Sequence, residues 1–435
     1  MIGVLLTGCT GVPTKSEKAA RADVAVVSER FGPGTPEEGG LTVESGLADY
    51  LRFGMLHQPG VRQAYYDWIG SVEQITGVRS LPDPRLTFRA DVGNLVMVLM
   101  PGLMQDLPGP GKLGLRADVA SEESASKYFQ FASTVLGAAF EVKQAYYRLY
   151  FLEDKIGIHR ENLELLSELE QLARTQNAVG KVTLQDVLRA QIEWEGVNTG
   201  IENLEDSRNL LMAQFKAALG IGAGEPDPVM PGHFESTTLD LDSETLFASA
   251  LRMNPRLKAL EAEVRMAQAG ISLARKAGVP DFFLGLKTNL KPSPAVWMPE
   301  AGMTLPIWRD KIAAELAAAQ SRKGSAEARL DAEEIGLAVS FADRMFSYRE
   351  SMRNLALLQE RLVPKALQSV EVARAGYMAG QIDFFNLIDA ERTLLEFQLS
   401  AVDARIQREL MLADLSLRIL SVLPSGAPLL SVPGQ

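Results

Sequence analysis

The sequence predicts a mainly α-helical protein with a small β part, in which one structural unit is used twice. Two stretches, residues 173–190 and 373–390, carry Ala, Arg, Gly, a β-branched residue, an aliphatic residue and Ala in register, about two hundred residues apart. In each unit, segments that alternate between apolar and polar residues precede a very long heptad pattern. This order indicates a pair of strands followed by a long helical hairpin, with the whole arrangement duplicated.

The composition is that of a folded chain. The 435 residues are 46% hydrophobic and 23% charged, which is too apolar for a disordered protein. A net charge of −11 without any basic stripe argues against a nucleic-acid partner. No run of eighteen apolar residues occurs, so no membrane-spanning helix is predicted, although amphipathic strands would give a much weaker signal.

The amino-terminal residues contain the only cysteine of the chain. Leu6-Thr7-Gly8-Cys9 follows a short apolar run and resembles a lipobox, the site at which a bacterial lipoprotein is cleaved and acylated. We therefore expect Cys9 to be lipidated, as an accessory anchor, since one acyl chain binds a membrane only marginally. The alternative is an incidental cysteine in a disordered start. A single cysteine excludes an internal disulfide.

Helical patterns begin with the same signal in both units. Residues 10–42 are rich in Gly, Pro, Lys and Glu and are predicted to be a linker. A helical pattern then runs from about Val43 to Arg79, interrupted at Gln58-Pro59, and the second unit has Asn254-Pro255 at the matching place. A proline in the first turn after a polar residue is typical of a helix start.

Each unit then changes to a period of two. Apolar residues alternate with polar residues after Pro84 and again after Pro280, which predicts strands with one apolar face. Loops are expected at roughly 96–103 and 291–297, each followed by a second strand and a proline-containing corner. Strands of about ten residues suit a tilted crossing of a bilayer.

Beyond each corner the heptad pattern predicts a helix of unusual length. The two helices are expected at about 117–175 and 312–375, packed at coiled-coil angles, and Pro364 should kink the second. Gly180 and Gly380 end them, and return helices follow at 183–220 and 383–421. The predicted organisation is a remnant signal or lipobox at 1–9, a linker at 10–42, a first repeat at 43–220, a connector at 221–242, a second repeat at 243–421 and a tail at 422–435.

Four strands cannot close a barrel. An open sheet edge in lipid leaves backbone groups unpaired, at several kcal/mol each. If the strands lie in a membrane, the protomer must oligomerise, and three copies would supply twelve strands.

Taken together, residues 43–421 resemble the TolC-type outer-membrane efflux proteins, and the corner Leu305-Pro306-Ile307-Trp308 resembles the heavy-metal and drug efflux branch. The resemblance implies a homotrimer whose 12-stranded β-barrel, surrounded by outer-membrane lipid, continues as an α-helical barrel into the periplasm. It implies docking on a periplasmic adaptor protein and an inner-membrane efflux pump. The expected function is a passive exit duct for metal ions, drugs or other small solutes.

The resemblance also implies a closing aperture around the glycine turns. Asp389 falls where the family places an acid of a lumen-facing ring, Asn386 stands where a second acid is frequent, and Asp383 is the alternative source of that acid. Tyr377, Gln185 and Asp186 fall at positions that hold the aperture closed through hydrogen bonds between helices. Gly180 and Gly380 mark the turns on which an adaptor would dock. The alternatives are a solvated charge for Asp389 and an ordinary first helical turn for Gln185 and Asp186.

No pattern for catalysis, cofactor binding or a metal site is found. The three histidines, His57, His159 and His233, are scattered without a spaced Cys or carboxylate partner. An enzyme is therefore not expected. The alternatives to an efflux duct are a protein-secretion duct and a non-pore coiled-coil protein of the cell envelope. The paired alternating segments argue against the second alternative, because a coiled-coil rod does not contain paired strands.

Overall fold

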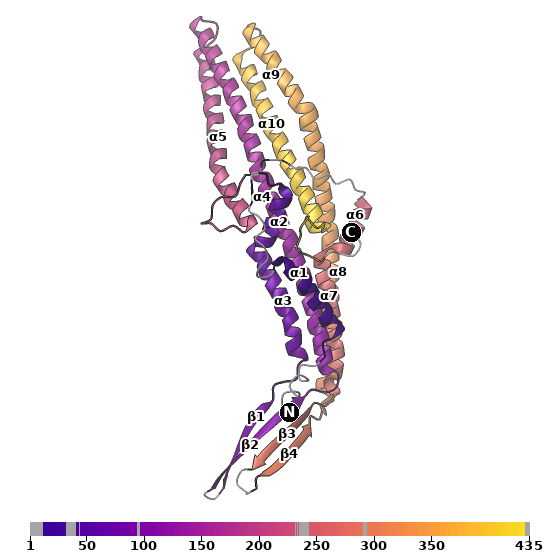
Figure 1. Cartoon of the computed structure of the whole chain (residues 1–435). Helices are drawn as coiled ribbons and strands as arrows, with labels where there is room; N and C mark the ends of the chain where they lie inside the picture. The colour runs from indigo at the N-terminus through magenta and orange to yellow at the C-terminus, as the bar shows by residue number, and fades with distance from the viewer. Residues whose placement is uncertain are drawn as a thin grey trace.

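The computed structural model describes residues 12–31, 41–42, 44–93, 96–230, 232, 234, 243–289 and 294–430. Cys9 and His233 lie outside these residues. The four strands lie at one end of a long molecule and the two helical turns at the other, with paired helices between them (Figure 1). The chain is mainly helical with one small sheet, as predicted from the sequence.

The two halves of the chain contain matching series of elements. The first half contains α1 (Lys15–Phe31), α2 (Leu47–His57), α3 (Pro59–Arg79), β1 (Arg85–Gly93), β2 (Val96–Leu107), α4 (Lys112–Ala178) and α5 (Leu184–Leu219). The second contains α6 (Ser243–Met253), α7 (Pro255–Arg275), the 3-10 turn η1 (Lys276–Gly278), β3 (Phe282–Asn289), β4 (Val296–Met303), α8 (Arg309–Leu357), the π-helical η2 (Leu358–Leu362), α9 (Val363–Met378), α10 (Phe384–Ala413) and the π-helical η3 (Asp414–Ile419).

The helix starts predicted at the two prolines are confirmed. Gln58 caps α3 by accepting a hydrogen bond from the Val61 amide, and Asn254 caps α7 by accepting one from the Arg256 amide. In each case the proline occupies the first helical turn, where its missing N–H has no partner to lose.

The strands form one antiparallel sheet in the order β1-β2-β3-β4. The loop predicted at roughly 96–103 is wrong, because β2 begins at Val96, and β4 likewise begins inside the loop predicted at 291–297. The start of β2 reads Val-Met-Val-Leu-Met, a continuous apolar run. Such a run carries no period of two, so alternation could not reveal that the strand begins there.

The long helices are confirmed, and α4 alone contains 67 residues, which at ~1.5 Å per residue is roughly 100 Å. The kink expected at Pro364 corresponds to η2, the π-helical segment directly before the proline-containing first turn of α9. Proline removes one backbone donor and crowds the preceding turn, and a π-segment accommodates both effects. In the part of the chain that the structure describes, none of the helices combines the length and apolar composition needed to cross a bilayer.

Buried side chains form clusters along the length of the molecule. The largest joins α1, α2, α3 and the first half of α4 with the end of α5, around Trp68, Tyr146 and Phe215. A second cluster joins α4, α5, α9 and α10 near the turns. A third joins α6, α7, α8 and η3. The core is therefore a series of helix interfaces.

The prediction of a linker over 10–42 is wrong for residues 15–31, which form α1. Ala20, Val24, Val27 and Phe31 recur at helical spacing and pack into the largest cluster. Phe31 stacks on Tyr65 of α3 with ring centroids 4.8 Å apart. The Gly and Pro residues on either side of this helix dominate the composition of the segment and obscured its pattern.

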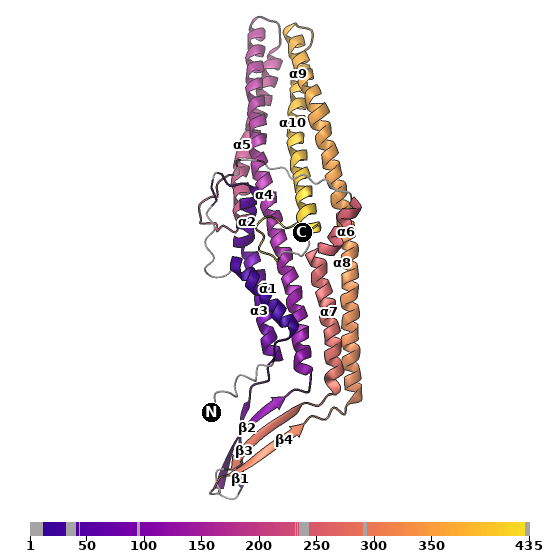
Figure 2. The same ribbon diagram turned by 45° about the vertical axis from the view of Figure 1, so that its right-hand side comes forward.

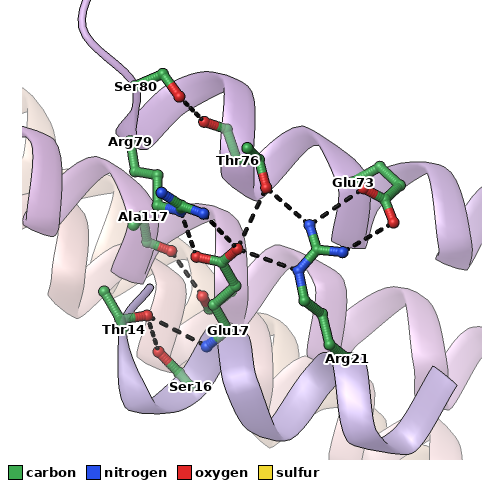
Figure 3. Close-up of polar contacts among 10 residues, drawn as sticks. Thr14, Ser16, Glu17, Arg21, Glu73, Thr76, Arg79, Ser80 and Ala117 are labelled. Atoms are coloured by element: carbon green, nitrogen blue, oxygen red, sulfur yellow. Dashed lines mark hydrogen bonds and ion pairs between the residues drawn. The ribbon is translucent and has the colours of Figure 1, made fainter. Parts of the chain in front are cut away.

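A buried ion pair holds α1 to α3 (Figure 3). Glu17 is fully buried, and its carboxylate accepts a 2.6 Å hydrogen bond from Arg79 Nε and further bonds from Arg21 and Thr76. Arg21 also pairs with Glu73 of α3. Burial raises the pKa of Glu17, but the bonds from Arg79 and Arg21 outweigh it, so the pKa lies below its ordinary value of 4.5.

We predict that Glu17→Gln lowers the free energy of unfolding by about 3–5 kcal/mol, because it leaves the buried Arg79 guanidinium without its counter-charge. The wild-type contribution should be present above about pH 4.5 and disappear as the pH falls through the lowered pKa. Thermal unfolding followed by circular dichroism measures both effects. Glu29→Gln, at an exposed position of the same helix, is the control and should change stability by less than about 0.5 kcal/mol. An unchanged midpoint for Glu17→Gln would mean that apolar contacts alone hold α1.

Candidate functional site at the tip of the hairpins

The two hairpin turns have the same backbone geometry. Gly180 and Gly380 have φ values of 73° and 71°, in the left-handed region that favours glycine. The Lys181 amide donates to the Gln176 carbonyl, and the Gln381 amide donates to the Gly376 carbonyl. These bonds satisfy carbonyls at the ends of α4 and α9, so both glycines are required by the turn.

The acids that follow the turns are used as helix caps. Thr183 and Asp186 form a capping box at the start of α5, in which Asp186 Oδ2 accepts from the Thr183 amide and hydroxyl, both at 3.0 Å. Asp383 caps α10 by accepting from the Asn386 amide at 3.0 Å. Two of the acids predicted near the aperture, Asp186 and Asp383, therefore stabilise helix starts in this conformation. The amide Gln185, predicted beside them, is exposed.

Asp389 and Asn386 are both exposed on α10, one turn apart. Asp389 lies on the wall of a groove of about 280 Å³ between α5 and α10. The groove is also lined by Arg189, Ile192 and Glu193 of α5 and by Phe385 and Arg392 of α10. Asp389 is thus an exposed carboxylate beside two arginines, and its negative charge contributes to a raised pKa of Arg392, after the larger effect of the Glu193 hydrogen bond.

Tyr377 is buried, with 3% of its surface exposed, and its ring packs edge-on against Phe384 at a centroid distance of 5.3 Å. Its hydroxyl has no hydrogen-bond partner among the described residues. Burial raises the pKa of this hydroxyl, and the negative charge of Asp186 raises it further. Tyr377 and Asp186 are therefore near neighbours, but the aspartate bonds to the helix cap and the tyrosine acts here through packing.

Near the tip, three contacts between the hairpins were not predicted from the sequence. Arg374 of α9 donates to Glu168 of α4 at 2.9 Å. Arg392 of α10 donates to both carboxylate oxygens of Glu193 on α5, at 2.8 Å for Nε···Oε2. The Arg189 guanidinium lies 5.0 Å from the centre of the Phe385 ring. Figure 2 shows that the two hairpins run side by side from the middle of the molecule and end in separate turns. These contacts therefore join the two hairpins close to their ends.

A buried acid at the tip was also missed. Glu391 of α10 is 1% exposed and lies among Leu387, Ile388 and Leu394 in the apolar stripe of the helix. The signal in the sequence was a charged residue at a stripe position, which is uncommon without a partner. Among the described residues, no group of three or more His, Cys, Asp or Glu side chains is placed to hold a metal ion.

Comparison with known proteins gives a consistent result. The sequence pattern of the family described as Outer membrane efflux protein matches residues 87–221 and 246–418. The cobalt-zinc-cadmium resistance protein CzcC of Cupriavidus metallidurans is 22% identical over 259 residues, which cover 59% of this chain. The match spans 61% of that relative's length.

Solved structures share the fold. A membrane protein from Pseudomonas aeruginosa superposes with a TM-score of 0.77 at 20% identity, covering 88% of this chain and 93% of that one. The outer membrane protein VceC of Vibrio cholerae superposes with a TM-score of 0.71 at 19% identity, covering 86% and 96%.

We predict that Tyr377→Ala destabilises the tip by about 3–5 kcal/mol through the loss of a buried ring. Tyr377→Phe should change it by less than about 1 kcal/mol, because the hydroxyl makes no bond here. Hydrogen exchange of the backbone amides of α9 and α10 measures the local stability. Equal loss of protection in both variants would show that the hydroxyl has a partner in the assembled protein.

Proposed function

The chain belongs to the outer membrane efflux protein family, and from this premise we propose that three copies assemble into the passive exit duct of a tripartite efflux pump. The duct would run from the periplasm through the outer membrane and carry out no chemistry on what passes. The observation that carries the proposal is the duplicated unit itself, a strand pair continued by a long helical hairpin and used twice along one axis (Figure 1).

The sheet supports both the membrane location and the trimer. Apolar side chains at alternate positions of β1 and β3 are exposed, as a face in contact with lipid requires, and they are Leu86, Phe88, Phe282, Leu284 and Leu286. The outer strands β1 and β4 each have one neighbour in the chain. In lipid those edges must be paired, and twelve strands from three copies close the sheet into a barrel.

The tip supports an aperture at the other end. Three copies of Asp389 around a narrow water path would favour cations over anions, with Asn386 one turn away as a neutral second layer. Tyr377 would hold the hairpins in the closed arrangement. The turns at Gly180 and Gly380, which are exposed, would be the docking surface for a periplasmic adaptor, which in turn binds an inner-membrane pump.

We propose that Cys9, which follows the lipobox-like sequence Leu6-Thr7-Gly8, is lipidated. The buried pair between Glu17 and Arg79 holds the start of α1 against the last residue of α3, which directly precedes the strands. The start of α1 therefore lies at the sheet end of the helices, and an acyl chain on Cys9 would be an accessory anchor to the sheet.

The relative CzcC is described as a cobalt-zinc-cadmium resistance protein, and we propose divalent metal ions as the cargo, with drugs or other small solutes as the alternative. The pump usually selects the cargo, so the duct itself needs only a water path with a cation preference.

We predict that purified protein in a planar bilayer gives small, stable, cation-selective current steps. Asp389→Asn should reduce the cation preference, because it removes three charges from the aperture, whereas Asp331→Asn on α8, exposed and away from the tip, should leave it unchanged. Unaltered selectivity in the Asp389 variant would remove this residue from the aperture. A water-soluble monomer that gives no current would end the duct proposal.

We predict that co-expression with an adaptor and pump of the metal-efflux class restores growth of a channel-deficient host at inhibitory zinc or cadmium concentrations. Co-expression with a drug-efflux adaptor and pump should not restore drug tolerance. The reverse pattern would assign the chain to drug efflux, and the empty vector is the control in both cases.

A further inference from the structure

The buried acid Glu391 is not explained by the aperture or by the docking surface. It lies on α10, two residues beyond Asp389, yet its side chain points into the helix interface and is 1% exposed. Both carboxylate oxygens are buried and have no hydrogen-bond partner among the described residues. This burial exists within a single chain, so no second copy is needed to remove the side chain from water.

The surroundings of Glu391 favour its neutral form. Burial raises the pKa of the carboxyl to about 7 from an ordinary value of 4.5, and the positive charge of Arg374 only partly opposes this. An ionised carboxylate without hydrogen bonds is strongly disfavoured in an apolar interface, whereas the protonated acid is tolerated.

Charged groups near Glu391 on the neighbouring helices are either paired with other residues or exposed to solvent. The guanidinium of Arg374 on α9 bonds to Glu168 of α4 at 2.9 Å. Glu170 of α4 accepts hydrogen bonds from Arg174 and Gln191. Glu193 of α5 pairs with Arg392 of α10, and Arg189 of α5 lies over the Phe385 ring. Lys365 and Glu371 of α9 and Asp389 of α10 are exposed to solvent.

The carboxylates of Glu168 and Glu391 therefore compete for the guanidinium of Arg374. With Glu391 protonated, Arg374 pairs with Glu168 and joins the second hairpin to the first. With Glu391 ionised, the same guanidinium is attracted to α10, its own hairpin, and the link to α4 is weakened. Water entry between the hairpins would stabilise the new charge in the same direction.

We propose that Glu391 is a proton-binding site that controls whether the two hairpins stay packed at the tip, with the protonated form packed and the ionised form separated. The inference rests on the proposed function, since separation affects transport only if these hairpins close the end of a duct. The sign follows from linkage: a carboxyl with a raised pKa contributes stability to the packed state that is fully present below the ordinary pKa of 4.5 and is lost as the pH rises from there to about 7. The ratio of packed to separated hairpins should fall on the order of a hundredfold across that transition.

The test measures the separation directly. Spin labels are placed at two exposed positions, Val179 on the first turn and Met378 at the end of α9 beside the second turn, in a chain with Cys9 replaced by Ser. Labelled chains are diluted with unlabelled ones so that distances within one protomer are read by pulsed electron paramagnetic resonance. In the wild-type chain the distance should lengthen or broaden as the pH rises from about 4.5 to about 7.

Glu391→Gln should keep the short distance at every pH, because the amide is neutral and similar in shape. Glu396→Gln, an exposed acid on the same helix, should retain the wild-type transition. Glu168→Gln should move the transition to lower pH, because it frees Arg374 to stabilise the ionised Glu391.

Two outcomes would overturn the proposal: a pH-independent distance in the wild-type chain, or a wild-type transition that survives in Glu391→Gln. Both are independent of the proposed function, because the label distance is read whether or not the protein conducts. Current steps in a bilayer together with a pH-independent distance would reject the proton site and leave the duct intact. A distance that depends on Glu391 in a protein that never conducts would support the proton site and reject the duct.

Discussion

The continuous helix α4 is the element on which the rest of the structure depends. It extends from the corner after β2 to the first turn, and α3, α5, α7 and α10 all pack against it (Figures 1 and 2). Small buried side chains such as Ala117, Ala139 and Ala145 allow these neighbours to approach closely. Most of the stability of a helix in a protein comes from the packing of its apolar face, so α4 and its neighbours stabilise one another.

Duplication has preserved the backbone of the two hairpins and changed their chemistry. Thr183 with Asp186 caps one return helix, and Asp383 with the Asn386 amide caps the other, with the acid exchanged between the two positions. Two hundred residues separate Arg189 from Asp389, which occupy the same place in the two copies and line the same groove. The groove therefore brings opposite charges together from equivalent positions.

Two buried glutamates show how the surroundings decide the state of one residue type. Glu17 is surrounded by guanidinium groups and a hydroxyl, which lower its pKa and make the charged form the stable one. Glu391 has no such donors among the residues that the structure describes, and burial raises its pKa to about 7. The first is suited to fastening α1 at all physiological pH values, whereas the second is suited to responding to pH within that range.

Local physical rules determined much of the fold from the sequence. The glycine turns, the proline helix starts and the long heptads depend on the backbone preferences of single residues and on periodicity, so they could be predicted. Asp389 is exposed on α10, and its place in an aperture ring stays a prediction. Only the tertiary structure decided which acids cap helices, which arginine pairs with which glutamate, and that the hydroxyl of Tyr377 is unbonded. It also revealed α1, which is held by Glu17 and Arg79, 62 residues apart in the chain, and the early start of β2, whose first residues form an apolar run without alternation. The physical reason is that the partner of a charge and the burial of an apolar run depend on residues that are distant in the sequence and become neighbours only in the folded chain.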